Sequence, residues 1–197
     1  MFTAVIDLGI ANLSNVVKAL DGRIVTHPGE LRDAGKLVLP GVGSFQAVTK
    51  RMEEFRGEIL RAIERGKPFL GICLGMQLLF ESSEEGEGRG LKVLKGRVVK
   101  FRGVRVPHIG WNRIHVVRPN PLLEGIEEGT FFYFVHSYYV CPEEENVVAC
   151  TTEHGDGNRI VFPSMVAIEN VFGVQFHPEK SSTVGLKLLE NFRRLKT

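Results

Sequence analysis

A cysteine lies between two glycines in GICLG at 71–75, where an apolar run changes into a helix-like pattern. This G-x-C-x-G form is the thiol version of the strand-to-helix turn that exposes a nucleophile. The glycines permit a tight turn, and the positive end of the following helix favours a thiolate over a thiol. We therefore hypothesise that Cys73 is a nucleophile. The alternative for this segment alone is a small buried core residue, the commonest role of a free cysteine.

A histidine and a glutamate in GVQFHPEK at 173–180 supply the groups that a thiol nucleophile needs. His177 follows the apolar strand expected at 171–176, Pro178 ends that strand, and Glu179 returns its side chain to the side of the imidazole. A nucleophile requires a base to manage its proton, and the base requires an orienting group. This pair favours the nucleophile over the core alternative.

The other five histidines are weaker candidates. His27, His115 and His154 lie beside turns or at strand positions that we expect to be exposed, so we interpret them as surface residues. His108 and His136 lie among aromatic and apolar residues, and we interpret them as structural histidines that could line a site. No histidine pair has metal-ligand spacing with carboxylates, so we expect no metal and no other cofactor.

The first half of the chain predicts the elements that hold these residues. Strand patterns occur at 3–8, 36–39 and 68–72, and helical patterns follow at 13–20, 56–65 and 74–81. This alternation predicts a parallel sheet that is covered on both faces.

The segment PGVG, Pro40 to Gly43, ends the second of these strands, because we expect proline and glycines to stop it there. Ligands bind at this edge of open α/β sheets, so its backbone N–H groups could receive an oxyanion, with the Leu74 N–H as a second donor. The alternative is a plain loop.

The second half predicts strands that are mostly antiparallel, at 98–101, 113–116, 130–135, 147–152, 160–168 and 171–176. Ser181 or Ser182 can cap a last helix, whose apolar side we expect to contain Leu186, Leu188, Leu189 and Phe192. The prediction is an α/β protein with an open, mostly parallel central sheet flanked by helices and an antiparallel extension in the second half. The chain shows no repeat or linker, so we expect one domain over residues 1–197.

Composition excludes several classes of function. Net charge is +2 in 197 residues, with 43% hydrophobic and 24% charged residues, and basic and acidic residues are interspersed. We therefore expect neither nucleic acid nor a membrane as a partner. The start, MFTAVIDLGI, reads as a strand rather than a signal peptide, so we expect cytoplasmic residence. Cys141 and Cys150 could approach each other across a hairpin, but disulfides are uncommon in that compartment.

These motifs resemble those of the class I (triad) glutamine amidotransferases, since PGVG, GICLGMQ and FHPE occur in the family's order. The resemblance covers essentially the whole chain. It is greatest to the branch formed by the glutaminase subunits of imidazole glycerol phosphate synthase, through GMQLLFE at 75–81, PHIGWN at 107–112, YFVHSYY at 133–139 and HPEKSS at 177–182. The start DLGIANL departs from the family's usual DYGxGNL.

The resemblance implies a flavodoxin-like fold and the hydrolysis of glutamine to glutamate and ammonia through a cysteinyl thioester. It makes Cys73 the nucleophile, His177 the general base and acid, and Glu179 the residue that orients His177. It also implies an oxyanion and substrate pocket formed by Gly43, Leu74, Gln77, Ser137 and Tyr138.

The resemblance further implies a partner, the (β/α)₈ cyclase subunit, which receives the ammonia. There the ribulosyl intermediate PRFAR gives imidazole glycerol phosphate and AICAR in histidine biosynthesis. The family's docking face corresponds to Asn12, Ile109, Trp111, Asn112, Tyr133 and Lys180. Without the resemblance, the only tryptophan of the chain would more readily be interpreted as a core residue.

Two alternatives remain. The chain could be the glutaminase of a pyridoxal phosphate, anthranilate or GMP synthase, although GMQLLF and HPEKSS argue against these. It could also be a non-catalytic regulatory subunit of the same fold, although the intact Cys73, His177 and Glu179 argue against that.

Overall fold

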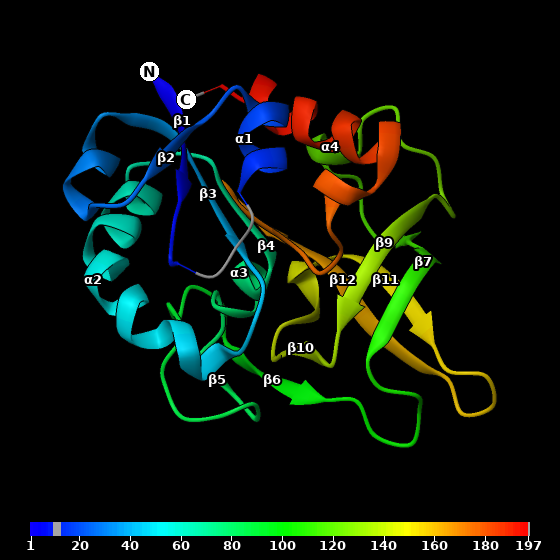
Figure 1. Ribbon diagram of the computed structural model, residues 1–197. Helices are drawn as coiled ribbons and strands as arrows, with labels where there is room; N and C mark the ends of the chain where they lie inside the picture. The colour runs from blue at the N-terminus through cyan, green and yellow to red at the C-terminus, as the bar shows by residue number, and fades with distance from the viewer. Residues whose placement is uncertain (10–12, 197) are drawn as a thin grey trace.

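An eight-stranded sheet forms the centre of the computed structural model, which describes residues 1–9 and 13–196 (Figure 1). The strand order is β2-β1-β3-β4-β13-β12-β11-β8. The pairings from β2 to β13 are parallel and the remaining three are antiparallel. The bounds are β1 Phe2–Ile6, β2 Arg23–Val25, β3 Ala34–Gly41, β4 Phe69–Cys73, β8 His115–Val116, β11 Val148–His154, β12 Ile160–Ile168 and β13 Val171–Val174. This confirms the predicted α/β fold; the predicted contact residue Asn12 lies outside the described residues.

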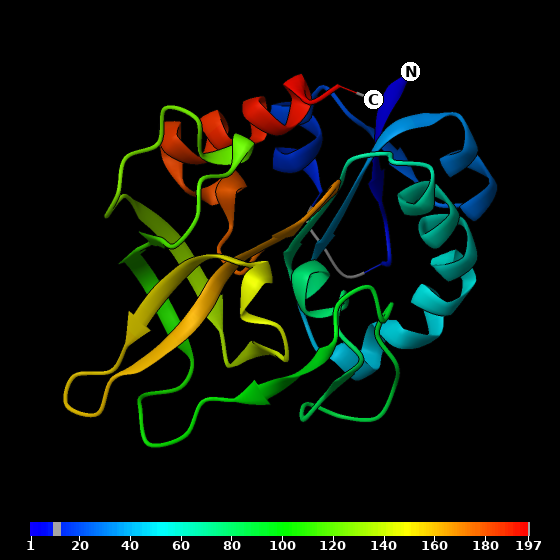
Figure 2. The same cartoon turned by 180° about the vertical axis from the view of Figure 1, so that it is seen from behind.

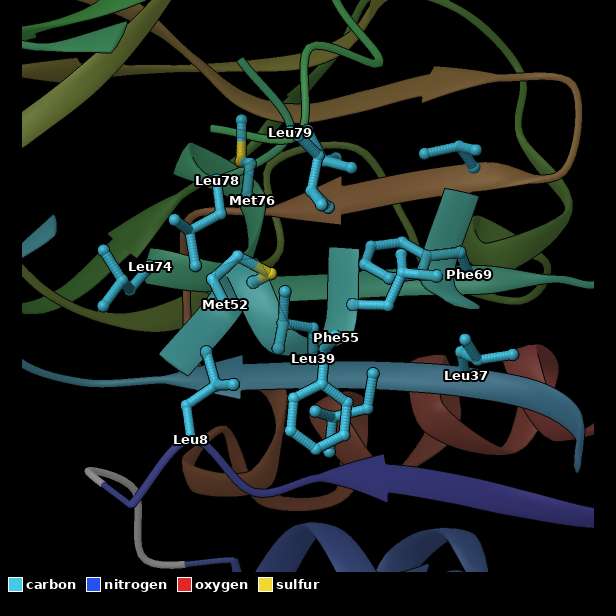
Figure 3. Packing of buried hydrophobic residues seen from close by; sticks show 14 of the residues in the cluster. Leu8, Leu37, Leu39, Met52, Phe55, Phe69, Leu74, Met76, Leu78 and Leu79 are labelled. Carbon is cyan, nitrogen blue, oxygen red and sulfur yellow. The ribbon is translucent and has the colours of Figure 1, made fainter. Parts of the chain in front are cut away.

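Helices cover both faces of the sheet, as Figures 1 and 2 show: α2 lies on one side, and α1 and α4 lie together on the other. Alternation along the strands divides the core accordingly. Leu37 and Leu39 of β3 belong to the cluster that includes Phe55 of α2 (Figure 3), whereas Val38 belongs to the cluster that includes Leu188 of α4. The bounds are α1 Ser14–Leu20, α2 Phe45–Glu64, α3 Leu74–Gln77 and α4 Ser182–Arg194. None of the described helices is long and apolar enough to span a bilayer.

Two smaller sheets complete the fold. One has the order β10-β6-β5, and the other is a two-stranded antiparallel ribbon of β7 and β9. Their bounds are β5 Ser82–Ser83, β6 Gly96–Lys100, β7 His108–Arg113, β9 Phe131–His136 and β10 Tyr138–Pro142. Short 3₁₀ turns are η1 Pro28–Arg32, η2 Pro121–Leu123, η3 Glu145–Val147 and η4 Pro178–Lys180. The sequence patterns missed β2, β5, β7 and β10.

Helix α2 begins at Phe45, so the expected start at residue 56 was wrong. Ser44 caps it, since its Oγ accepts a hydrogen bond from the Ala47 N–H at 3.3 Å. Val48 and Met52 are fully buried on the same apolar stripe, which continues along the whole helix.

Helix α3 ends at Gln77 rather than at residue 81. The carbonyls of Leu78 and Leu79 accept hydrogen bonds from Leu91 and Leu94, at 2.6 and 3.0 Å, so they are not available to a further helical turn.

Strand β3 continues through Pro40 to Gly41, which contradicts the expected stop. Its pairing with β1 ends at Val38, whereas its pairing with β4 continues to Cys73. The missing N–H of Pro40 therefore costs no ladder bond on the β1 side, where the strand has become an edge.

Helix α4 also differs from the expectation. Ser181 stands at its N-cap, but the Oγ makes no capping bond and instead donates to the His177 carbonyl at 2.6 Å. Leu186 is 51% exposed, whereas Leu188, Leu189 and Phe192 are buried. The apolar side of α4 is therefore narrower than the sequence suggested.

Candidate active site

Cys73 lies at a strained turn between β4 and α3. Its backbone has φ 54° and ψ −106°, in the positive-φ region that residues with a side chain rarely adopt. A Cβ on Gly71 would collide with the Gly75 carbonyl, and one on Gly75 would collide with the Leu39 carbonyl of β3. Both glycines are therefore required for the close approach of α3 to the sheet, and this packing holds Cys73 in its strained conformation.

His177 reaches the same edge of the sheet from β13. This strand pairs in parallel with β4 as far as Val174 and Ile72, so the chain continues past Cys73 to His177. The turn η4 then brings the Glu179 Oε1 to 2.8 Å from the His177 Nδ1. The structure thus brings the three predicted triad residues together.

The β7–β9 ribbon and the start of α4 hold the backbone of His177. The His177 N–H donates to the Tyr133 carbonyl at 2.9 Å, and the Ser181 Oγ accepts from the Tyr133 N–H at 2.9 Å. The Ser181 hydroxyl in turn donates to the His177 carbonyl. His177 is therefore fixed by its backbone as well as by Glu179.

The electrostatics of the triad favour a protonated imidazole. Burial lowers the pKa of His177, but the neighbouring Cys73 and the Glu179 carboxylate together outweigh burial and raise that pKa above its usual value. Among the residues that the structure describes, the His177 Nε2 has no hydrogen-bond partner of normal geometry. Since Nδ1 is engaged by Glu179, Nε2 is the atom available for chemistry with the sulfur.

A pocket of about 380 Å³ opens beside the sulfur. Its lining contains all of the predicted pocket residues, together with others that the sequence did not single out as substrate-binding. The predicted ones are Gly43, Leu74, Gln77, Ser137 and Tyr138, and the additional ones include Val42, Glu85, Val135, His136 and Lys180. A hollow of about 70 Å³ lies next to it and is lined by His177 and Glu179; Val42 and Lys180 line both spaces.

Glu85 and Gln175 are site residues that sequence reasoning missed. The Glu85 Oε2 accepts a hydrogen bond from the Phe45 N–H at 2.6 Å, which fixes the carboxylate at the pocket. Gln175 is fully buried, and its Nε2 lies 3.6 Å from the Cys73 Sγ. The signal for Gln175 was present, because a polar residue within an apolar buried strand needs a partner. Glu85 lies in a charged loop and gave no such signal.

The residues predicted to dock a partner lie on and around the β7–β9 ribbon. Ile109 and Trp111 are 59% and 52% exposed, so the core interpretation of Trp111 was wrong. Tyr133 pairs with Trp111 across the ribbon, with ring centroids 6.1 Å apart. Asn112 lies on the same ribbon and Lys180 is exposed in η4.

Three histidines pack together behind the pocket. The His108 Nδ1 lies 2.9 Å from the His136 Nε2, and the His154 ring lies 4.2 Å from the His108 ring. His154 is half-buried in this stack, so the expectation of a solvated surface residue was wrong. Burial lowers the pKa of His108 to about 4 and that of His136 to about 3, so both are neutral near pH 7.

The comparisons agree with this geometry. The family described as glutamine amidotransferase class-I matches residues 5–195. Among solved structures, PurLQS from Thermotoga maritima superposes with a TM-score of 0.75 at 22% identity, covering 98% of each chain. A putative GMP synthase protein from Thermoplasma acidophilum gives 0.70 at 19%, covering 98% of this chain and 92% of the other. At these identities the two structures support the fold alone. Fold, triad and family match define a class-I glutamine amidotransferase.

The curated relatives narrow the class. Proteins named imidazole glycerol phosphate synthase subunit HisH are 58% identical in Thermococcus kodakarensis, over 98% of this chain and 99% of the relative. The corresponding values are 54%, 98% and 98% in Pyrococcus furiosus, and 45%, 97% and 98% in Methanocaldococcus jannaschii. The chain therefore belongs to the class-I glutamine amidotransferases, in the branch of the HisH subunits of imidazole glycerol phosphate synthase.

Proposed function

We propose that this chain is the glutaminase subunit of an imidazole glycerol phosphate synthase and that Cys73, His177 and Glu179 carry out the hydrolysis. The observation that carries the proposal is the strained Cys73 beside a buried His177–Glu179 pair with an Nδ1–Oε1 distance of 2.8 Å. We take residues 1–197 as one amidotransferase domain that acts in the cytoplasm. Its three cysteines are free, as expected in a reducing compartment.

In the first step, the Cys73 thiolate attacks the side-chain carbonyl carbon of glutamine. The carbonyl π bond opens to an oxyanion, which the N–H groups of Leu74 and Gly43 would receive. Leu74 is the first residue of α3, so its N–H has no partner within the helix. When the C–N bond breaks, the His177 Nε2 gives its proton to the departing nitrogen, which leaves as ammonia.

In the second step, the neutral His177 takes a proton from water as the water oxygen attacks the thioester carbonyl. Collapse of this intermediate breaks the C–S bond and releases glutamate and the thiolate. Glu179 remains ionised throughout and holds the Nδ1–H, so that Nε2 faces the sulfur in both steps.

The pocket suits the amino-acid end of glutamine. Gln77 has two amide donors, and its Nε2 bonds both to the Tyr138 carbonyl at 3.1 Å and to Gln175 at 3.2 Å. Its Oε1 is therefore the atom available for substrate, and this acceptor suits an ammonium group. The Glu85 carboxylate supplies a matching negative charge.

We propose that the ammonia passes to the (β/α)₈ cyclase subunit, which docks on the β7–β9 ribbon. Exposed Ile109 and Trp111 support this surface, since large aromatic and aliphatic anchors carry most of the binding energy of interfaces. Tyr133 links the surface to the triad, because its carbonyl accepts the His177 N–H.

Glutamate release by the chain mixed with PRFAR and the cyclase subunit tests the activity, with wild type and Cys73→Ala compared. We expect release to depend on PRFAR and the partner, to be low in the isolated chain, and to disappear in the variant. Equal release by the two proteins would reject the catalytic assignment, and vigorous partner-independent turnover would reject the coupling.

The docking surface has its own test. Trp111→Ala should weaken binding to the cyclase subunit by about 2 kcal/mol, roughly 30-fold, because truncating a buried anchor removes its contacts. Val161→Ala is the matched control, since Val161 is 58% exposed on β12, outside the ribbon. Titration calorimetry measures both; equal affinities would show that the partner docks elsewhere.

A further inference from the structure

The Cys73 sulfur has a second polar neighbour that the triad mechanism does not use. The Gln175 Nε2 lies 3.6 Å from the Sγ, and Gln175 is fully buried. The pairing of β13 with β4, which ends with Val174 beside Ile72, brings the next residues, Gln175 and Cys73, together. Gln175 therefore reaches the sulfur from the neighbouring strand.

The orientation of the Gln175 amide is fixed by a chain of hydrogen bonds that ends on a backbone atom. The Tyr138 carbonyl can only accept, so it requires the NH₂ group of Gln77, at 3.1 Å. The same NH₂ group donates to the Gln175 Oε1 at 3.2 Å. A flipped Gln175 would set two donors against each other at this contact. Its NH₂ group must consequently point at the sulfur.

The two protonation states of the sulfur have different partners. A thiol can donate its proton to the Val135 carbonyl, 3.9 Å from the Sγ. A thiolate cannot donate, but it can accept from the Gln175 amide. A hydrogen bond to the charged form of a group favours that form. Unlike His177, Gln175 has no proton to lose, so its contribution persists at every stage of the cycle.

We propose that Gln175 belongs to the catalytic machinery, donating a hydrogen bond from its side-chain amide to the Cys73 thiolate in an orientation fixed by Gln77 and the Tyr138 carbonyl. The proposal rests on the proposed function, in which Cys73 is the nucleophile. It adds a stabilising group for the thiolate both as the attacking species and as the leaving group of the second step.

Alkylation of Cys73 by iodoacetamide as a function of pH tests the proposal on the full chain. Mass spectrometry of the Cys73 peptide separates it from Cys141 and Cys150. Gln175→Met keeps the length of the side chain and removes the donor. We expect the pH of half-maximal alkylation rate to rise by about one unit, a tenfold change, because hydrogen bonds to ionised groups are of that strength.

Two further variants sharpen the test. Gln175→Glu keeps an acceptor for Gln77 but sets a carboxylate against the sulfur, so the midpoint should rise further. Ser164→Ala is the matched control: Ser164 is fully buried on β12, its carbonyl accepts the Gln175 N–H at 2.9 Å, and its Oγ has no partner among the described residues. Its midpoint should equal that of wild type.

An unchanged midpoint in Gln175→Met, with thermal unfolding like that of wild type, would overturn the proposal. Should that variant fail to fold, Gln77→Met decides, because it frees the Gln175 amide to rotate. A smaller upward shift supports the proposal and no shift overturns it.

Glutamine turnover in the complex with the cyclase subunit separates this inference from the proposed function. We expect Gln175→Met to lower kcat about tenfold, since the stabilised thiolate takes part in both steps. Absence of turnover by the wild-type complex would reject the proposed function, whereas normal turnover and an unchanged alkylation midpoint in the variant would reject the inference alone.

Discussion

Two histidine–glutamate pairs in this chain have almost the same geometry and different surroundings. The Nδ1–Oε1 distance is 2.8 Å in His177–Glu179 and 2.9 Å in His115–Glu128. The side chains of the first pair are 2% and 8% exposed, whereas those of the second are 48% and 58% exposed. The second pair lies at the outer strand β8 and the first at the edge of the sheet beside Cys73.

The comparison shows that the hydrogen bond between the two side chains does not define a catalytic pair. Water screens the exposed pair, so holding its imidazole in one charge state contributes little. The buried pair has lost that solvent, and its charges act on each other and on Cys73 at low dielectric. Burial and the neighbouring sulfur therefore distinguish the base from a surface ion pair.

The largest difference between the pairs should appear when each histidine is removed. His177→Ala in the complex with the cyclase subunit should lower kcat for glutamine by a factor on the order of 10³ or more, because no group would protonate the leaving nitrogen. His115→Ala removes the matched but exposed imidazole and should leave kcat unchanged. Steady-state glutamate release measures both; similar losses would place the distinction elsewhere than in the triad.

A smaller difference is expected for the carboxylates. Glu179→Gln keeps an acceptor for Nδ1 but removes the negative charge, so kcat should fall by a factor on the order of 10². Glu128→Gln, whose oxygen can still accept the Val116 N–H, is the control and should be indistinguishable from wild type. If the two variants behave alike, Glu179 does not orient the base.

The smallest expected effect concerns the proton on His177. Because Cys73 helps to raise the pKa of His177, Cys73→Ala should lower that pKa by about one unit or more. NMR titration of the His177 imidazole nitrogens measures it. Cys150→Ala is the matched control, because burial raises the pKa of the Cys150 thiol to about 12, which leaves it uncharged. An unchanged His177 titration in Cys73→Ala would contradict the electrostatic account.

The same shift predicts a pH dependence of stability. The folded chain binds the His177 proton more tightly than the unfolded chain does, since the folded pKa is raised. The added stability is fully present below the ordinary histidine pKa of about 6.5 and is lost as the pH rises through the folded value. Urea unfolding should therefore show wild type losing more stability than Cys73→Ala over this window.

The sequence predicted the parts of the fold that depend on local patterns. The parallel half follows from apolar strands that alternate with helices, and the apolar stripe of α2 was readable from Phe45 onward although we placed its start too late. The extension of β3 through Pro40 could not be read locally, because it depends on where β1 ends. The early end of α3 likewise depends on Leu91 and Leu94, which reach its carbonyls from a distant loop.

For the site, the motifs around Cys73 and His177 predicted the residues that the structure brings together. What they could not predict is which neighbour completes each group. His154 was taken for a surface residue because nothing in its own segment shows that His108 stacks on it. Gln175 became interpretable once the register of β13 against β4 placed it beside the sulfur.

The central claim is that Cys73, and no other group, attacks the carboxamide carbon of glutamine. A chloroketone analogue of glutamine, incubated with the complex of this chain and the cyclase subunit, tests it directly through peptide mass spectrometry. The account predicts one adduct, on Cys73, that excess glutamine suppresses and that Cys73→Ala lacks. An adduct on Cys141 or Cys150 with Cys73 unmodified would contradict the account.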